Sequence, residues 1–97
     1  MIRRTVRVVN ELGLHMRAAN VFVERAAAQT ANVLVSRGDL RVNGKSIMGL
    51  MMLAAPLGTE LVIEVEGPDE ESAAATLVDL VESGFGEGAS ENSEGSK

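Results

Sequence analysis

The only histidine of this 97-residue chain, His15, lies in the stretch LGLHMRAAN, with Arg17 two residues after it. An imidazole is a nucleophile near neutral pH and can hold a transferred phosphoryl group covalently. A guanidinium offers a fork of donors that suits phosphate oxygens. This pair of residues is therefore a candidate for phosphoryl chemistry, although a lone histidine in a loop is more often simply solvated.

The hydrophobic spacing after His15 predicts that a helix begins there. Apolar residues recur at i, i+3, i+4 and i+7, which indicates a helix over about 16–28. The first backbone N–H groups of a helix lack internal partners and favour an anion, whereas a basic residue such as Arg17 opposes the helix dipole unless an anion is present. The arrangement fits a phosphohistidine carrier. The predicted buried face consists of Ala19, Phe22, Val23 and Ala26.

Other chemistries have little support in the sequence. The chain has no cysteine, and no carboxylate stands at ligand spacing from His15, so we expect no metal. There is no G-x-S-x-G segment, and VNGKS lacks the spaced glycines of a phosphate-binding loop. A serine, histidine and acid triad could still assemble in space. We expect no cofactor.

Ser46 is a second candidate at a predicted helix start. It directly precedes IMGLMML, and serine is a preferred N-cap residue, so we expect a helix over about 47–53 that is ended by Pro56 and Gly58. Capping alone accounts for this serine; phosphorylation would add nearly two negative charges there. A helix so short and apolar on all sides cannot bury every side chain, so we expect part of it to be exposed for partners. The candidates are Ile47, Met48, Leu50, Met51 and Met52.

The remaining elements predict an α+β fold. β-branched residues and turn signals indicate strands, with positive φ at Gly38 between the second and third, and a further helix follows Pro68 and Asp69 and stops at Gly84. The order β-α-β-β-α-β-α predicts a four-stranded antiparallel sheet with three helices on one face. The predicted strands are 2–9, 31–36, 40–43 and 60–66, and the last helix is 69–83.

Composition bounds the location and the partners. Without cysteine, signal-like segment or long apolar run, we expect a cytoplasmic protein with no membrane insertion. Residues 1–48 carry eight basic against three acidic residues, and 49–97 carry one against eleven. One hypothesis is a basic face of His15, Arg17 and Lys45 that steers acidic partners; the alternative is a mixed surface. Two phenylalanines and net acidity argue against nucleic acid.

The chain divides into one domain and a tail. Residues 1–85 contain every predicted element, whereas 86–97 are rich in glycine, serine and glutamate and contain no apolar side chain larger than alanine. Such a segment cannot offset its ordering entropy by burial. We therefore expect a folded domain over 1–85 followed by a disordered tail over 86–97.

Two segments carry a resemblance to a known family. GLHMRAA around His15 and GKSIMGLMML around Ser46 resemble the two signature segments of HPr, the histidine-containing phosphocarrier of the bacterial phosphoenolpyruvate-dependent phosphotransferase system. The resemblance covers roughly residues 2–85. It implies an open-faced β-sandwich, and the element order inferred above matches that fold.

The resemblance also implies roles by position. His15 matches the histidine that takes a phosphoryl group on Nδ1 from enzyme I and passes it to enzyme IIA proteins, and Arg17 matches the arginine beside it. Ser46 matches the serine that HPr kinase/phosphorylase modifies in many members, in some creating a corepressor for a transcriptional regulator. The protein would be a stoichiometric carrier, expected as a monomer, rather than a turnover enzyme. The docking surface would include Ile47, Met48, Met51 and Met52.

Two positions depart from the family pattern. The family usually has His-x-Arg-Pro, with a small residue after the histidine, and this chain has Met16 and Ala18 there. The departure leaves an alternative open: a regulatory binding module or a member of a nitrogen or carbon regulatory phosphorelay, with little role in sugar transport.

Overall fold

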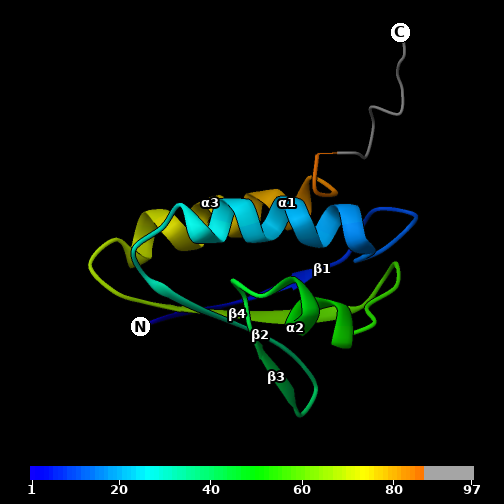
Figure 1. Cartoon of the computed structure of the whole chain (residues 1–97), viewed down its shortest axis with the longest axis horizontal. Coiled ribbons are helices and arrows are strands. Elements are labelled where there is room, and N and C mark those ends of the chain that lie inside the picture. Colours follow the sequence, from blue (N-terminus) through cyan, green and yellow to red (C-terminus); the bar gives the residue numbers. More distant parts are fainter. Residues whose placement is uncertain (87–97) are drawn as a thin grey trace, which may run out of the picture.

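The computed structural model describes residues 1–86, and three helices and four strands occur within them (Figure 1). The order is β-α-β-β-α-β-α, as predicted. The predicted tail, apart from Gly86, lies outside the described residues. The strands are β1 (Ile2–Arg7), β2 (Asn32–Arg37), β3 (Leu40–Asn43) and β4 (Glu60–Glu66); the helices are α1 (Met16–Ala27), α2 (Ile47–Met52) and α3 (Glu70–Glu82).

The four strands form one antiparallel sheet in the order β1-β4-β2-β3. β4 pairs with both β1 and β2, so β1 and β2 run parallel with β4 between them, and α1 connects them. In the same way β3 and β4 run parallel with β2 between them, and α2 connects them. Because of this interlocking, α1 begins, α2 ends and α3 ends at one end of the sheet, which we call the histidine end; the other is the amino-terminal end.

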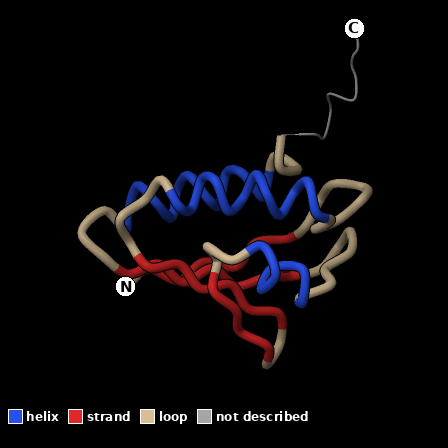
Figure 2. Tube along the Cα trace, viewed as in Figure 1, coloured by secondary structure: helices blue, strands red, loops and turns tan. Residues whose placement is uncertain are grey.

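The helices cover one side of the sheet (Figure 2). α3 packs on β1 and β4, α1 packs against α3 and α2, and α2 packs against β3. The alternation in β4 puts Leu61, Ile63 and Val65 in the core and turns its glutamates outward. The predicted face of α1 is buried, except that Val23 is half-buried, and α3 buries Ala73, Ala74, Leu77, Leu80 and Val81. The largest fully buried side chains are Leu50, Leu53, Ile63, Leu77, Val8, Val35, Val65 and Val81.

Most predicted boundaries agree with the structure to within one residue, but β1 is shorter than predicted. It ends at Arg7, because Val8 leaves the regular ladder to pair with the loop before β4. The Val8 N–H donates to Thr59 O at 2.9 Å, and the Gly58 N–H donates to Val8 O at 2.8 Å. These bonds hold together the two loops that enclose the histidine end.

The predicted cause of the end of α2 is wrong. The helix ends at Met52, four residues before Pro56, and Ala54 turns the chain with φ +48°. A left-handed residue after the C-cap is a common way to end a helix, although glycine is the usual choice. The Arg37 guanidinium, from the end of β2, donates to Leu53 O at 3.0 Å and Ala54 O at 2.6 Å. A cation therefore holds the free carbonyls of α2, as the helix dipole favours.

No helix within residues 1–86 is long and apolar enough to cross a membrane. The hairpin between β2 and β3 turns at Gly38 with φ +58°, as predicted.

Candidate functional site

His15 is the N-cap of α1. Its backbone is extended, with φ −83° and ψ 179°, and its carbonyl accepts the first helical bond, from the Ala19 N–H at 2.8 Å. The Arg17 N–H donates to the imidazole Nδ1 at 3.3 Å. A ring nitrogen that accepts an N–H carries a lone pair, so the proton of a neutral ring lies on Nε2. The half-buried histidine thus points its Nδ1 lone pair into the first turn of the helix.

The loop before His15 is fixed by backbone bonds to the loop after α2. The Leu14 N–H donates to Ala55 O at 2.8 Å, and the Asn10 side-chain amide donates to Gly13 O at 2.8 Å. Gly13 has φ +70°, and a Cβ there would lie 2.6 Å from Ala55 O. Only glycine therefore fits where the two loops cross. The approach of these loops sets the start of α1, and with it the position of His15.

The side chain of Arg17, two residues after His15, differs in its contacts from the arginines of the sheet. Arg17 is exposed, and within residues 1–86 its guanidinium makes no hydrogen bond or ion pair. By contrast, Arg3, Arg7 and Arg41 pair with carboxylates of β4. Arg17 is therefore available to an anion bound at the helix start.

The two positions that depart from the family pattern also differ. Met16 is 63% exposed and Ala18 is fully buried. Ala18 lies in the first turn, before the first helical bond is donated by Ala19, so the helix does not need a proline there. Its methyl group is part of the core, whereas the Met16 side chain is exposed.

Ser46 caps α2 as predicted. Its backbone is extended, with φ −120° and ψ 118°, and its Oγ accepts the Gly49 N–H at 3.0 Å. The side chain is half-buried. Ser46 lies at the beginning of α2, whereas the end of α2 leads into the loop that contacts Leu14. The two candidate residues, His15 and Ser46, are therefore separated along α2.

The predicted docking residues are exposed to different degrees. Met48 is 79% exposed and Met52 is 66% exposed, while Ile47 and Met51 are half-buried. Leu50, also a candidate for exposure, is buried in the core. Positions 48 and 52 are one helical turn apart and share a face. α2 itself packs against α1, the helix that follows His15.

The predicted basic face of His15, Arg17 and Lys45 is wrong. The Lys45 Nζ donates to Gln29 O at 2.9 Å, at the carboxyl end of α1. The 12 residues of α1 span about 18 Å, so Lys45 and His15 lie at opposite ends of the helix. The Lys45 ammonium thus binds a carbonyl beyond the C-terminus of α1, where the helix dipole favours a cation.

The amino-terminal end of the molecule is held by carboxylates. Asp69 is at the N-cap position of α3, where the helix start was predicted, but its side chain makes no cap bond; it accepts the Thr30 and Ala31 N–H groups, both at 2.8 Å. The Thr30 N–H chiefly, with the Ala31 N–H, lowers the pKa of Asp69. The carboxylate therefore joins the start of α3 to the segment between α1 and β2.

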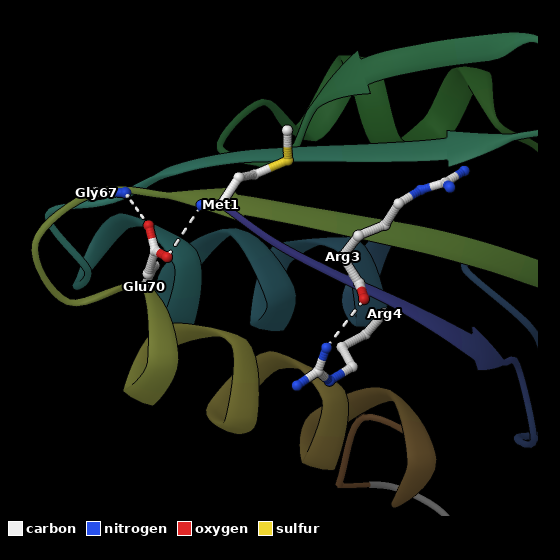
Figure 3. Close-up of polar contacts among 5 residues, drawn as sticks. All are labelled: Met1, Arg3, Arg4, Gly67 and Glu70. Carbon is white, nitrogen blue, oxygen red and sulfur yellow. Dashed lines mark hydrogen bonds and ion pairs between the residues drawn. The ribbon is translucent and has the colours of Figure 1, made fainter.

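Glu70 fixes the chain terminus in the same region (Figure 3). Its carboxylate accepts the Gly67 N–H at 3.1 Å and pairs with the Met1 amino group at 3.1 Å. The Gly67 N–H, followed by the Met1 ammonium, lowers the pKa of Glu70. Next to this contact, the Arg4 guanidinium folds back on Arg3 O at 3.1 Å on the edge strand β1.

Sequence reasoning missed three contributors to the histidine end. Leu12 and Leu57 are 71% and 53% exposed on the two loops that meet there. Arg37 supports the end of α2 from a distant strand, and no local pattern reveals that contact. For Leu57 the sequence does offer a signal of exposure. Pro56 and Gly58 on either side of it indicate a turn, and an apolar residue in a turn is seldom buried. Among the described residues, no group of three histidine or acidic side chains could hold a metal ion.

Comparison with known proteins defines the class of this arrangement. A protein-family model described as "PTS HPr component phosphorylation site" matches residues 2–83. The phosphocarrier protein HPr of Neisseria meningitidis serogroup A is 49% identical over 88 residues, covering 91% of this chain and 99% of the relative. The HPr of Cupriavidus necator is 42% identical over 88 residues, with 91% and 99% coverage.

Solved structures agree. HPr-C-His from Thermoanaerobacter tengcongensis aligns with a TM-score of 0.85 and 42% identity, covering 89% of this chain and 97% of that one. The Bacillus subtilis protein Crh, described as a swapped dimer, aligns with a TM-score of 0.70 and 38% identity, covering 87% and 97%. The fold and the sequence are thus those of a phosphocarrier protein of the phosphotransferase system. The chain belongs to the HPr family.

Proposed function

We propose that this protein carries a phosphoryl group on Nδ1 of His15, taking it from phosphorylated enzyme I and donating it to enzyme IIA proteins. The observation that carries the proposal is the position of the imidazole as N-cap of α1, with its Nδ1 lone pair facing the first-turn amide of Arg17. Family membership supplies the phosphotransferase context. The protein is a stoichiometric intermediate in this account, not a turnover enzyme.

The transfer step needs no proton from elsewhere. The lone pair of His15 Nδ1 attacks phosphorus, a new N–P bond forms, and the N–P bond to the donor histidine breaks with its electrons returning to the donor ring. The product is a phosphoimidazolium that keeps its proton on Nε2. Pentacoordinate phosphorus spreads charge over its equatorial oxygens, so catalysis depends on positioning and on charge stabilisation.

The helix start supplies that stabilisation. Before transfer the Arg17 N–H is held by Nδ1. The lone pair leaves this hydrogen bond in order to attack phosphorus, and the released amide can then donate to a phosphoryl oxygen. The positive end of α1 and the guanidinium of Arg17 add charge complementarity. The amides of the helix start are already oriented before the reaction, so the Arg17 amide changes only its acceptor.

Partners would dock on the apolar surface beside the site. Exposed Met16, Met48 and Met52 lie on α1 and α2, and flexible thioether side chains adapt to different partner surfaces. A carrier must bind a donor and several acceptors with the same face, so adaptable contacts suit it. Half-buried Ile47 and Met51 complete the predicted docking set.

Ser46 would regulate docking if it is phosphorylated by an HPr kinase/phosphorylase. Its Oγ already caps α2 at the Gly49 N–H, and a phosphate at a helix start is locally favourable. It would repel an acidic partner at the edge of the docking face, and the same charge could recruit a transcriptional regulator. A Ser46→Asp variant should lower the rate of transfer from enzyme I, and an unchanged rate would contradict this role.

We infer a monomer in the cytoplasm. The strand most open to exchange, β1, pairs along its whole length with β4 of the same chain, and the Met1 amino group is tied to Glu70. Light scattering during gel filtration should give the mass of one chain. A stable dimer, as described for the B. subtilis relative, would contradict the inference.

The test of the proposed function is a phosphorylation assay with enzyme I and phosphoenolpyruvate. The parent chain should gain one acid-labile phosphoryl group, and His15→Ala should gain none. Arg17→Lys keeps the positive charge but loses the paired N–H donors of the guanidinium, so His15 of this variant should be phosphorylated more slowly. Equal labelling of His15→Ala and the parent would refute the proposal.

A further inference from the structure

The methionines of this chain fall into two groups by position. Met16, Met48 and Met52 are 63%, 79% and 66% exposed and gather on the two helices beside His15. Met1 is 68% exposed but lies at the amino-terminal end, next to Gly67 and Glu70 (Figure 3). The six residues of β1 span about 20 Å, which separates Met1 from the histidine end. Met51 is half-buried against the core.

We propose that oxidation of Met16, Met48 and Met52 by peroxides reversibly switches off docking on the exposed faces of α1 and α2. The inference rests on the proposed function, because it concerns the surface through which His15 meets its partners. In the reaction, the thioether sulfur gives two electrons to hydrogen peroxide and takes one oxygen, forming a sulfoxide and water. A methionine sulfoxide reductase reverses it with a dithiol, which becomes a disulfide as water is released.

The exposure of these side chains determines both their reactivity and the consequence. Peroxide reaches sulfur atoms that are open to solvent, so the three exposed thioethers react before the half-buried Met51. A sulfoxide replaces an apolar, adaptable contact with a polar and chiral one. Because these three side chains contribute little to the core, the fold should survive their oxidation.

The surroundings make docking sensitive to this change. Met48 and Met52 share one face of α2, and Met16 follows His15 directly. The neighbouring exposed side chains Leu12 and Leu57 are also apolar. Binding energy in interfaces is concentrated in a few residues, and each new sulfoxide dipole on the docking surface must be desolvated when a partner binds.

The test compares transfer before and after oxidation. The full-length chain is treated with hydrogen peroxide, the peroxide is removed with catalase, and each methionine is followed by peptide mass spectrometry. The rate of phosphorylation by enzyme I and phosphoenolpyruvate should fall about five- to tenfold. The thermal unfolding midpoint should stay within the error of the measurement, and reductase treatment should restore the rate.

The control is a chain with Met16→Leu, Met48→Leu and Met52→Leu, which keeps Met1 and Met51. Its rate after peroxide is divided by its own rate before peroxide, so any effect of the substitutions on basal transfer cancels. That ratio should stay at one while Met1 is oxidised.

Four results would overturn the inference. They are an unchanged rate with all three methionines oxidised, an equal loss in the control chain, a loss that matches unfolding, and resistance of the three residues while Met1 reacts. If the untreated parent accepts no phosphoryl group, the proposed function fails first and takes this inference with it.

Discussion

The two ends of this molecule are held together by different means. At the histidine end, the joining contacts are made to backbone carbonyls, by backbone amides as in Leu14 N–H to Ala55 O and by the Arg37 guanidinium at Leu53 O and Ala54 O. At the amino-terminal end, the side chains Asp69, Glu70 and Lys45 make the joining contacts. The comparison shows that the loops at the histidine end are joined at backbone carbonyls, whereas carboxylates make much of the joining at the amino-terminal end.

Substitution of one glycine at each end should have the largest effect on the stability of the fold. Gly13→Ala would put a Cβ 2.6 Å from Ala55 O, and Gly67→Ala would put one 2.7 Å from the Cα of Ala31. Both positions have positive φ, so each change should cost about 2–4 kcal/mol of unfolding free energy in chemical denaturation.

Only one of these variants should affect transfer. When the rate from enzyme I is corrected for the folded fraction, Gly13→Ala should be slower than the parent and Gly67→Ala equal to it. Gly38→Ala, with φ +58° and no neighbour within 4 Å, is the control for strain without a clash. Equal corrected rates for the Gly13 and Gly67 variants would show that the loop crossing does not position His15.

Asp69→Asn tests the ionic end through pH. Because the folded-state pKa of Asp69 is lowered, chiefly by the Thr30 N–H, its carboxylate stabilises the fold above the unfolded-state pKa of about 3.9. This stability is lost as the pH falls through the lower, folded-state pKa. The variant should be less stable at pH 7 and should lose less on acidification. Denaturation at pH 7, 4 and 2.5 measures this; parallel curves for parent and variant would contradict it.

Ser46→Ala should have a smaller effect. The variant loses the Oγ cap on the Gly49 N–H, which typically costs about 1 kcal/mol. Phosphorylation of His15 should continue, because Ser46 lies at the far end of α2. Thermal unfolding and the transfer assay measure the two parts separately. A transfer loss as large as that of Arg17→Lys would place Ser46 in the transfer site itself.

The smallest effect is expected for acetylation of the Met1 amino group. It removes the ammonium that pairs with Glu70 at 3.1 Å, while the Gly67 N–H bond to Glu70 remains. Exposed ion pairs contribute little and are screened by salt. The unfolding midpoint should drop slightly at low salt, and the drop should shrink at high salt. A salt-independent loss would mean that the contact acts by something other than charge.

The difference between local contacts and contacts between distant segments explains which features the sequence could predict. Periodicity and cap residues predicted α1, α2 and α3 and placed His15 just before α1 and Ser46 as the N-cap of α2, because these signals are local. Lys45 was misplaced and the cause of the end of α2 was missed, since both depend on contacts between distant segments, Lys45 with Gln29 and Arg37 with Leu53. The role of Gly13 also needed the approach of Ala55, which no local pattern contains.

The most direct test of the account locates the phosphoryl group. NMR of the ¹⁵N-labelled protein, phosphorylated by enzyme I and phosphoenolpyruvate, identifies both the modified nitrogen and the amides that respond. The account predicts coupling of phosphorus to Nδ1 of His15, with a large shift of the Arg17 amide as it exchanges Nδ1 for a phosphoryl oxygen. A phosphoryl group on Nε2, or on any residue other than His15, would contradict it.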